Sequence, residues 1–133
     1  MDDATAILKN SRTVAVVGLS DKPERPSFQV AEYLMANGYA IIPVNPNIAS
    51  WKGIKAYASL SEVREKVDVV DIFRKSGDVS PIVDDAIAIK ANAVWMQLGI
   101  VNEAAAAKAR AAGIAVVMDR CMRIEHMKMG KNR

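Results

Sequence analysis

The chain has 133 residues and a formal net charge of +3, a length that predicts one domain over residues 1–133. No apolar run reaches the roughly 20 residues of a membrane span, the N-terminus lacks a signal-peptide pattern, and one cysteine excludes an intrachain disulfide. The mild charge and the 5% aromatic content argue against nucleic-acid binding. We therefore expect a cytoplasmic domain that binds a small anionic ligand, with no membrane association.

The first predicted elements surround a glycine. A short amphipathic helix is predicted over residues 3–10. The apolar run Val14–Val17 is typical of a buried strand, and Gly18 ends it. After a polar loop, a helix is predicted from Ser27 to Asn37.

The next predicted strand covers Ala40–Val44. Pro43 is expected to weaken its pairing, because proline has no N–H to donate. A loop follows over Asn45–Tyr57, in which Trp51 acts as an apolar plug, and a short helix is predicted over Leu60–Glu65.

The second half of the chain alternates strands and helices. Strands are predicted at Val67–Phe73, Ala93–Leu98 and Ile114–Met118, and helices at Asp78–Lys90 and, capped by Asn102, Glu103–Ala112. The last residues are predicted to form a packed turn with Met122, Met127 and Met129, followed by a solvated basic tail with Lys128, Lys131 and Arg133.

Strands and helices therefore alternate along the chain, and the strands are almost continuously apolar. Such strands are buried on both faces, as in a parallel sheet covered by helices. We predict an α/β, Rossmann-like, doubly wound fold with a five-stranded parallel sheet. Counted along the chain, the predicted strand order is 3-2-1-4-5.

In open α/β sheets, ligands bind outside the carboxyl ends of the strands. The loop from Gly18 to Ser27 lies at that edge and has the layout of a phosphate site. Backbone N–H groups and the positive end of the helix dipole attract an anion there, and Lys22 and Arg25 add two cations.

Two other phosphate-binding motifs are absent. A nicotinamide dinucleotide fingerprint requires glycines where the chain has Ser20 and Pro23, and an acidic residue where Val44 is followed by Asn45. No G-x-x-x-x-G-K-[ST] loop occurs. A small NAD(P)-dependent oxidoreductase is therefore kept only as an alternative interpretation.

The segments GLSDKPERPSFQVAEYL, IPVNPN, VDIFRKS, VWMQLGI and VVMDRCM together resemble the small stand-alone CoA-binding domain family. That family has a Rossmann-like fold related to the CoA-binding domain of the succinyl-CoA synthetase α subunit. The resemblance covers nearly the whole chain. It implies non-enzymatic binding of coenzyme A or an acyl-CoA and indicates no catalytic residue; it does not identify a protein partner.

The resemblance also implies which residues bind the ligand. The phosphate loop would contain Gly18, Leu19, Ser20, Asp21, Lys22 and Pro23, with Arg25 and Ser27 at the helix start. The adenine and its ribose would be bordered by Val44, Asn45 and Pro46. The pyrophosphate or the pantetheine arm would pass Phe73, Arg74, Lys75 and Ser76, and then Gln97, Leu98 and Gly99.

Cys121 follows the last predicted strand and faces the same site. Arg120 and Arg123 would favour its thiolate, so a mixed disulfide with the thiol of CoA is a second hypothesis, in a redox-responsive protein. The simpler interpretation is a small buried apolar residue.

Three further polar residues have structural interpretations. Arg74 either contacts the ligand or pairs with Asp71 or Asp78. Asp71 lies within a strand, where a carboxylate is costly unless it is paired, so we expect it to have a partner. His126 is the only histidine, and no metal site is predicted.

Overall fold

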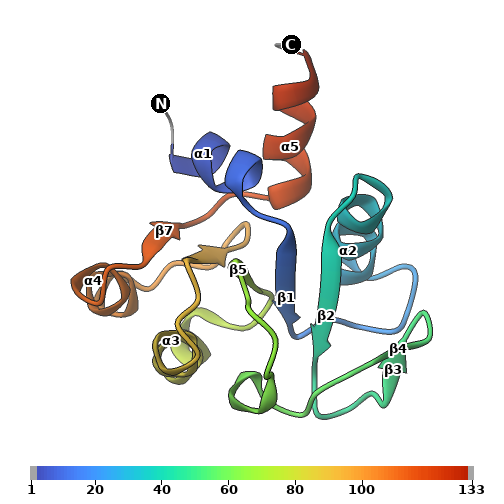
Figure 1. Ribbon diagram of the computed structural model, residues 1–133, viewed down its shortest axis with the longest axis horizontal. Helices are drawn as coiled ribbons and strands as arrows, with labels where there is room; N and C mark the ends of the chain where they lie inside the picture. The colour runs from blue at the N-terminus through green and yellow to red at the C-terminus, as the bar shows by residue number, and fades with distance from the viewer. Residues whose placement is uncertain (1–2, 132–133) are drawn as a thin grey trace.

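The computed structural model of the chain describes residues 3–131 and contains a five-stranded parallel sheet with helices on both faces (Figure 1). The strands of this sheet are β1 (Thr13–Val17), β2 (Ala40–Val44), β5 (Val69–Ile72), β6 (Ala93–Met96) and β7 (Ala115–Val117). The helices are α1 (Asp3–Asn10), α2 (Pro26–Ala36), α3 (Val79–Ala88), α4 (Glu103–Ala111) and α5 (Met122–Lys131). The predicted α/β class and the parallel five-stranded sheet are confirmed.

The strand order differs from the predicted one. Across the sheet the strands run β2-β1-β5-β6-β7, so β5 pairs with β1 instead of lying outside β2. Counted along the chain this order is 2-1-3-4-5, a doubly wound arrangement, and the predicted 3-2-1-4-5 was wrong. Asp68 holds the observed pairing, because its carboxylate accepts hydrogen bonds from the N–H groups of Arg12 (2.8 Å) and Thr13 (3.0 Å) at the start of β1.

Pro43 does not interrupt strand pairing, contrary to the prediction. The register between β2 and β1 continues through Pro43 to Val44. Ala40 donates its N–H to Arg12 O on the β1 side, and successive N–H groups of a strand alternate between its two sides. Position 43 therefore faces the outer edge of the sheet, where a missing donor is tolerated.

The two faces of the sheet have separate apolar cores. Alternate residues of β1 point to opposite faces: Val14 and Val16 pack with α1, α2 and α5, and Ala15 and Val17 pack with α3 and α4. The apolar strands are therefore buried on both sides, as their composition predicts.

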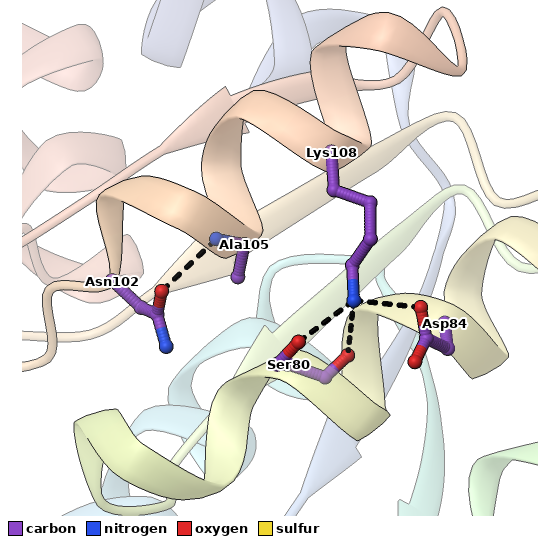
Figure 2. Close-up of polar contacts among 5 residues, drawn as sticks. All are labelled: Ser80, Asp84, Asn102, Ala105 and Lys108. Carbon is purple, nitrogen blue, oxygen red and sulfur yellow. Dashed lines mark hydrogen bonds and ion pairs between the residues drawn. The ribbon is translucent and has the colours of Figure 1, made fainter.

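Polar contacts add to the packing of α3 against α4. Lys108 on α4 donates from Nζ to Ser80 Oγ at 2.7 Å and pairs with Asp84 Oδ1 at 2.7 Å, both on α3 (Figure 2). At the start of α4, Asn102 Oδ1 accepts a hydrogen bond from Ala105 N at 2.9 Å, which confirms the predicted helix cap. These contacts fix α4 relative to the rest of the fold.

The loop after β2 contains a hairpin that the sequence did not predict. Its strands are β3 (Ser50–Trp51) and β4 (Ile54–Lys55), and the predicted helix that follows is a shorter 3₁₀ turn over Leu60–Glu62. Trp51 is buried and packs edge-on against Phe28, with ring centroids 5.4 Å apart. The hairpin therefore covers the start of α2.

The residues predicted as a terminal turn form the helix α5 instead. Met122 is fully buried, whereas Met127 is exposed, so the helix has little of the apolar periodicity that predicts one. Lys128 is exposed and pairs with Glu125 at 3.2 Å; the side chain of Lys131 and the whole of Arg133 lie outside the described residues. Within the described part of the chain, no helix is long and apolar enough to cross a membrane.

Candidate functional site

An open cleft of about 460 Å³ lies at the carboxyl ends of β1, β2 and β5. From β1 the chain first adds β2 on one side of β1 and later adds β5 on the other side. The strand order therefore reverses at β1, and the cleft lies at this switch point of the sheet. The residues that line it are Gly18, Ser20, Asp21, Lys22, Arg25, Pro26, Ser27, Asn45, Asn47, Ile48 and Phe73. Eight of these eleven lining residues are predicted site residues, and the structure brings them together. The other three, Pro26, Asn47 and Ile48, were not predicted.

Gly18 allows the β1 loop to touch the β5 loop. Its φ is +88°, and a Cβ at this position would stand 2.5 Å from the carbonyl oxygen of Phe73. Only glycine adopts this backbone angle readily and leaves room for such an approach. The N–H of Gly18 donates to Val44 O at 2.8 Å, so the ends of β1, β2 and β5 meet at this residue.

The loop after Gly18 is held by its own hydrogen bonds. Ser20 N donates to Ser27 Oγ (2.9 Å), and Lys22 N donates to Ser20 Oγ (3.1 Å). Arg25 N donates to Lys22 O at 3.0 Å. These amides already have acceptors, so they are less available to an anion than the sequence suggests.

The N-terminus of α2 offers free donors to the cleft. Amides in the first turn of a helix have no helical acceptor, and no side chain caps α2 in the described part of the chain. Pro26 has no N–H, which leaves the amides of Ser27 and Phe28. Because Arg25, Pro26 and Ser27 line the cleft, the positive end of the helix dipole opens on it.

Two cationic side chains line the cleft at this helix end, and a third, that of Arg74, lies beside Gly18 outside the cleft lining. Lys22 and Arg25 are exposed and form no ion pair with any described residue. Arg74 lies over Gly18, with its Nε 3.4 Å from the position of a Cβ there. In the part of the chain that the structure describes, Arg74 pairs with neither Asp71 nor Asp78, which leaves its guanidinium free for a ligand.

The wall opposite α2 comes from the loop after β2. Asn45 Nδ2 donates to Leu19 O at 2.9 Å, and Asn45 Oδ1 accepts from Asn47 N at 2.9 Å, so one side chain joins two loops of the cleft. Asn47 and Ile48 were not among the predicted site residues. Both lie in the loop predicted over Asn45–Tyr57, but the hairpin in that loop, which places Ile48, left no recognisable signal in the sequence.

The other predicted site residues lie outside the cleft. Three are buried in the fold (Leu19, Val44 and Gln97), and four lie on flanking loop surfaces (Pro23, Pro46, Lys75 and Gly99). Ser76 Oγ accepts a hydrogen bond from Val101 N at 3.0 Å, and Gln97 Oε1 accepts one from Met122 N at 3.1 Å, so both hold neighbouring segments in place. Contact between any of these residues and a ligand stays a prediction.

Leu98 and Cys121 line a second and larger cavity, of about 1130 Å³, which we call the α1–α5 groove. Its walls come from α1, from the segment before β2, from the loops after β6 and β7, and from α5. Cys121 is 8% exposed and immediately precedes α5, where its carbonyl accepts from Glu125 N at 3.0 Å. The thiol is therefore buried beside a cavity, and both hypotheses for it stay open.

Asp71 lies in neither cavity. It is fully buried on β5, level with Val16 on one neighbouring strand and Trp95 on the other, and neither carboxylate oxygen has a hydrogen-bond partner among the described residues. The expected partner is therefore not found. Burial raises the pKa of Asp71 well above its ordinary value, because desolvation penalises the charged form.

His126 makes structural contacts between α5 and two tyrosines. Its Nδ1 lies 2.8 Å from Tyr33 Oη, and its ring packs edge-on against Tyr33 and Tyr39, so it joins α5 to α2. In the described part of the chain, no three His, Cys, Asp or Glu residues are grouped as a metal site would require.

Comparison with known proteins gives a consistent result. Residues 12–127 match the model of a family described as CoA binding domain. The uncharacterized protein YneT of Bacillus subtilis (strain 168) is 40% identical over 120 residues, which are 90% of this chain and 89% of that protein. The crystal structure of Prb, the PH1109 protein redesigned for binding, is 36% identical, with a TM-score of 0.95 over 100% of this chain and 95% of that one.

A larger enzyme contains a similar fold. A dinucleotide forming acetyl-coenzyme A synthetase 1 from Ca. Korarchaeum cryptofilum is 26% identical, with a TM-score of 0.69. The match covers 79% of this chain and 25% of the synthetase chain. The fold described above therefore corresponds to about a quarter of that protein.

Proposed function

The chain belongs to the CoA binding domain family, and from this premise we propose that it binds coenzyme A or an acyl-CoA with the adenosine diphosphate part in the cleft at β1, β2 and β5. The observation that carries the proposal is the uncapped N-terminus of α2, which opens on the cleft next to Lys22 and Arg25. Coenzyme A carries a pyrophosphate and a 3′-phosphate, so its recognition requires several donors and cations at one place.

Each side of the cleft has a role in this proposal. Arg25, Lys22 and Arg74 bind phosphate oxygens, the arginines through two parallel N–H donors and the lysine as a point charge. The amides of Ser27 and Phe28 add donors at the helix end. Asn47 and Ile48, on the opposite wall, border the adenosine.

Calorimetric titration of the full chain with CoA, dephospho-CoA and NAD tests this proposal. We expect CoA to bind, dephospho-CoA to bind more weakly because it lacks the 3′-phosphate, and NAD not to bind. The double variant Lys22→Gln/Arg25→Gln is expected to weaken CoA binding about ten-fold, since both removed charges are exposed and partly screened.

A control of equal charge is available for this experiment. Arg64 and Arg110 are exposed, line neither cavity and form no ion pair with a described residue. Arg64→Gln/Arg110→Gln should therefore bind CoA as the wild type does. NAD binding as tight as CoA binding, or an equal loss of affinity in the control, would contradict the proposal.

A covalent mode at Cys121 is the second candidate, and it is favoured by the position of this cysteine on the wall of the α1–α5 groove. In thiol–disulfide exchange, the Cys121 thiolate would attack CoA disulfide, form a mixed disulfide with one CoA and release the other as its thiol. Intact-mass measurement after incubation with CoA disulfide should show the mass of one added CoA. Cys121→Ser should show none, and an addition to that variant would exclude Cys121 as the site.

A further inference from the structure

The cleft and one end of the α1–α5 groove lie at the carboxyl edge of the sheet. Phe73, on the wall of the cleft, directly follows β5, and Leu98, on the wall of the groove, follows the neighbouring strand β6. Cys121 follows β7, one strand further along. Because neighbouring strands are about 4.8 Å apart, a flexible ligand arm that crosses the end of β5 reaches the groove within about two strand spacings.

At this edge the groove presents apolar side chains. Leu98 is 59% exposed, and Ile124, in the first turn of α5, is 44% exposed. Both line the groove together with Cys121. Exposed leucine and isoleucine side chains on the wall of one cavity offer a surface for the methylene groups of a ligand.

The carboxylates that line the groove are already bound within the protein. Glu125 pairs with Arg120 at 3.7 Å and with Lys128 at 3.2 Å. Asp119 Oδ1 accepts a hydrogen bond from Gly99 N at 2.7 Å. An incoming anion therefore meets no unpaired carboxylate among these groups.

Two cations of the groove have no such partner. Lys9, in the last turn of α1, and Arg12, just before β1, are exposed and form no ion pair with any described residue. They line the groove near Asn37 and Gly38, which precede β2 and so lie toward the amino ends of the strands. The groove therefore has an apolar end at the carboxyl edge and a basic end at the amino edge.

From this arrangement we propose that the α1–α5 groove receives the acyl group of an acyl-CoA whose acyl chain ends in a carboxylate. The proposal rests on CoA binding in the cleft. The thioester would lie near Leu98 and Cys121, the methylene groups would follow Ile124, and the terminal carboxylate would pair with Lys9 and Arg12.

The strand register indicates the length of acyl chain that suits the groove. Val14 is level with Ala93 through β5, and Arg12 lies two residues before Val14. Leu98 and Arg12 are therefore about seven residues, or about 23 Å, apart along the strand direction. An acetyl group is too short to extend from Leu98 toward Lys9 and Arg12. The extended Arg12 side chain covers about 7 Å of this distance, and an ion pair of about 3 Å and an apolar contact of about 4 Å at the two ends cover about 7 Å more. About 9 Å remain for the acyl chain, so a dicarboxylic acyl chain of medium length, about eight carbons, is the expected class.

Calorimetric titration in the presence of a reductant tests the inference with octanoyl-CoA and suberyl-CoA, which have equal chain lengths and differ in the terminal carboxylate. The full chain is expected to bind suberyl-CoA about five-fold more tightly, as two exposed ion pairs allow. Lys9→Gln/Arg12→Gln should abolish this preference without changing the affinity for octanoyl-CoA. Arg64→Gln/Arg110→Gln, of equal net charge, should keep the preference.

The outcomes separate this inference from the proposed function. If CoA binds but the two thioesters bind equally, or if the preference survives in Lys9→Gln/Arg12→Gln, the acyl-group inference is wrong and CoA binding stands. If free suberate binds as well without CoA as with it, the groove is a site for free dicarboxylates and the acyl assignment is overturned. If CoA itself does not bind, the proposed function fails, and this inference with it.

Discussion

Replacing Gly18 with alanine is expected to lower the free energy of unfolding by about 3 kcal/mol and to abolish binding in the cleft. The φ of +88° is unfavourable for alanine, and its Cβ would stand 2.5 Å from the backbone oxygen of Phe73. Relief of this clash requires the β1 and β5 loops to separate. For a domain of this length, such a loss lowers Tm by about 10 °C, which chemical and thermal denaturation will measure.

Gly113→Ala is the matched control for this experiment. Gly113 has a similar φ of +84°, but a Cβ there would meet no atom within 4 Å. Its replacement should cost about 1 kcal/mol, which is the cost of the backbone angle alone. Equal losses in the two variants would show that the close approach to Phe73 contributes nothing.

Asp71→Asn is expected to make the protein about 3 kcal/mol more stable at pH 7, because it removes a carboxyl group that is buried without a partner and that ionises readily only in the unfolded chain. Burial raises the pKa of Asp71 in the folded state, so the folded protein holds a proton that the unfolded chain releases at lower pH. The free energy of unfolding of the wild type should therefore fall as the pH rises above the ordinary pKa of an aspartate toward the raised value. The variant should lack this decrease.

Denaturant titrations of both proteins from pH 4 to pH 8 will measure the difference, which should be small at pH 4 and grow with pH. Asp68→Asn, just before the same strand β5, is a control for which the expected change in the free energy of unfolding has the opposite sign. The carboxylate of Asp68 accepts hydrogen bonds from two backbone N–H groups, so its loss should destabilise the protein by about 1 kcal/mol. If the wild type and Asp71→Asn have equal free energies of unfolding at every pH, burial does not raise the pKa of Asp71 and this prediction is wrong.

Local sequence patterns predicted most of the elements and the location of the cleft. The apolar run before Gly18, the polar loop and the start of α2 lie where they were predicted, and the cleft forms around them. These features depend on residues close in sequence. The sequence therefore predicted which loop lines the cleft, whereas the hydrogen bonds that occupy the amides of Ser20 and Lys22 could be seen only in three dimensions.

The strand order could not be read from local patterns, because both orders use the same strands and right-handed connections. Pro43 nevertheless distinguishes the two strand orders. In the predicted order β2 would have neighbours on both sides, and Pro43 would fail to donate to one of them. In the observed order β2 is an edge strand, where Pro43 is tolerated. The prediction that Asp71 has a partner was wrong for a different reason, since its burial is set by β1 and β6, which are distant in sequence.

The edge formed by β2 has a consequence for self-association. Pro43 offers no N–H to a strand arriving from solvent, its carbonyl already accepts from Tyr57 N at 3.0 Å, and Asn45 N donates to Tyr57 O at 2.9 Å. The opposite edge, β7, is only three residues long. An incoming chain would find few unoccupied backbone groups on either side, so the sheet is protected against strand-by-strand growth into fibrillar aggregates.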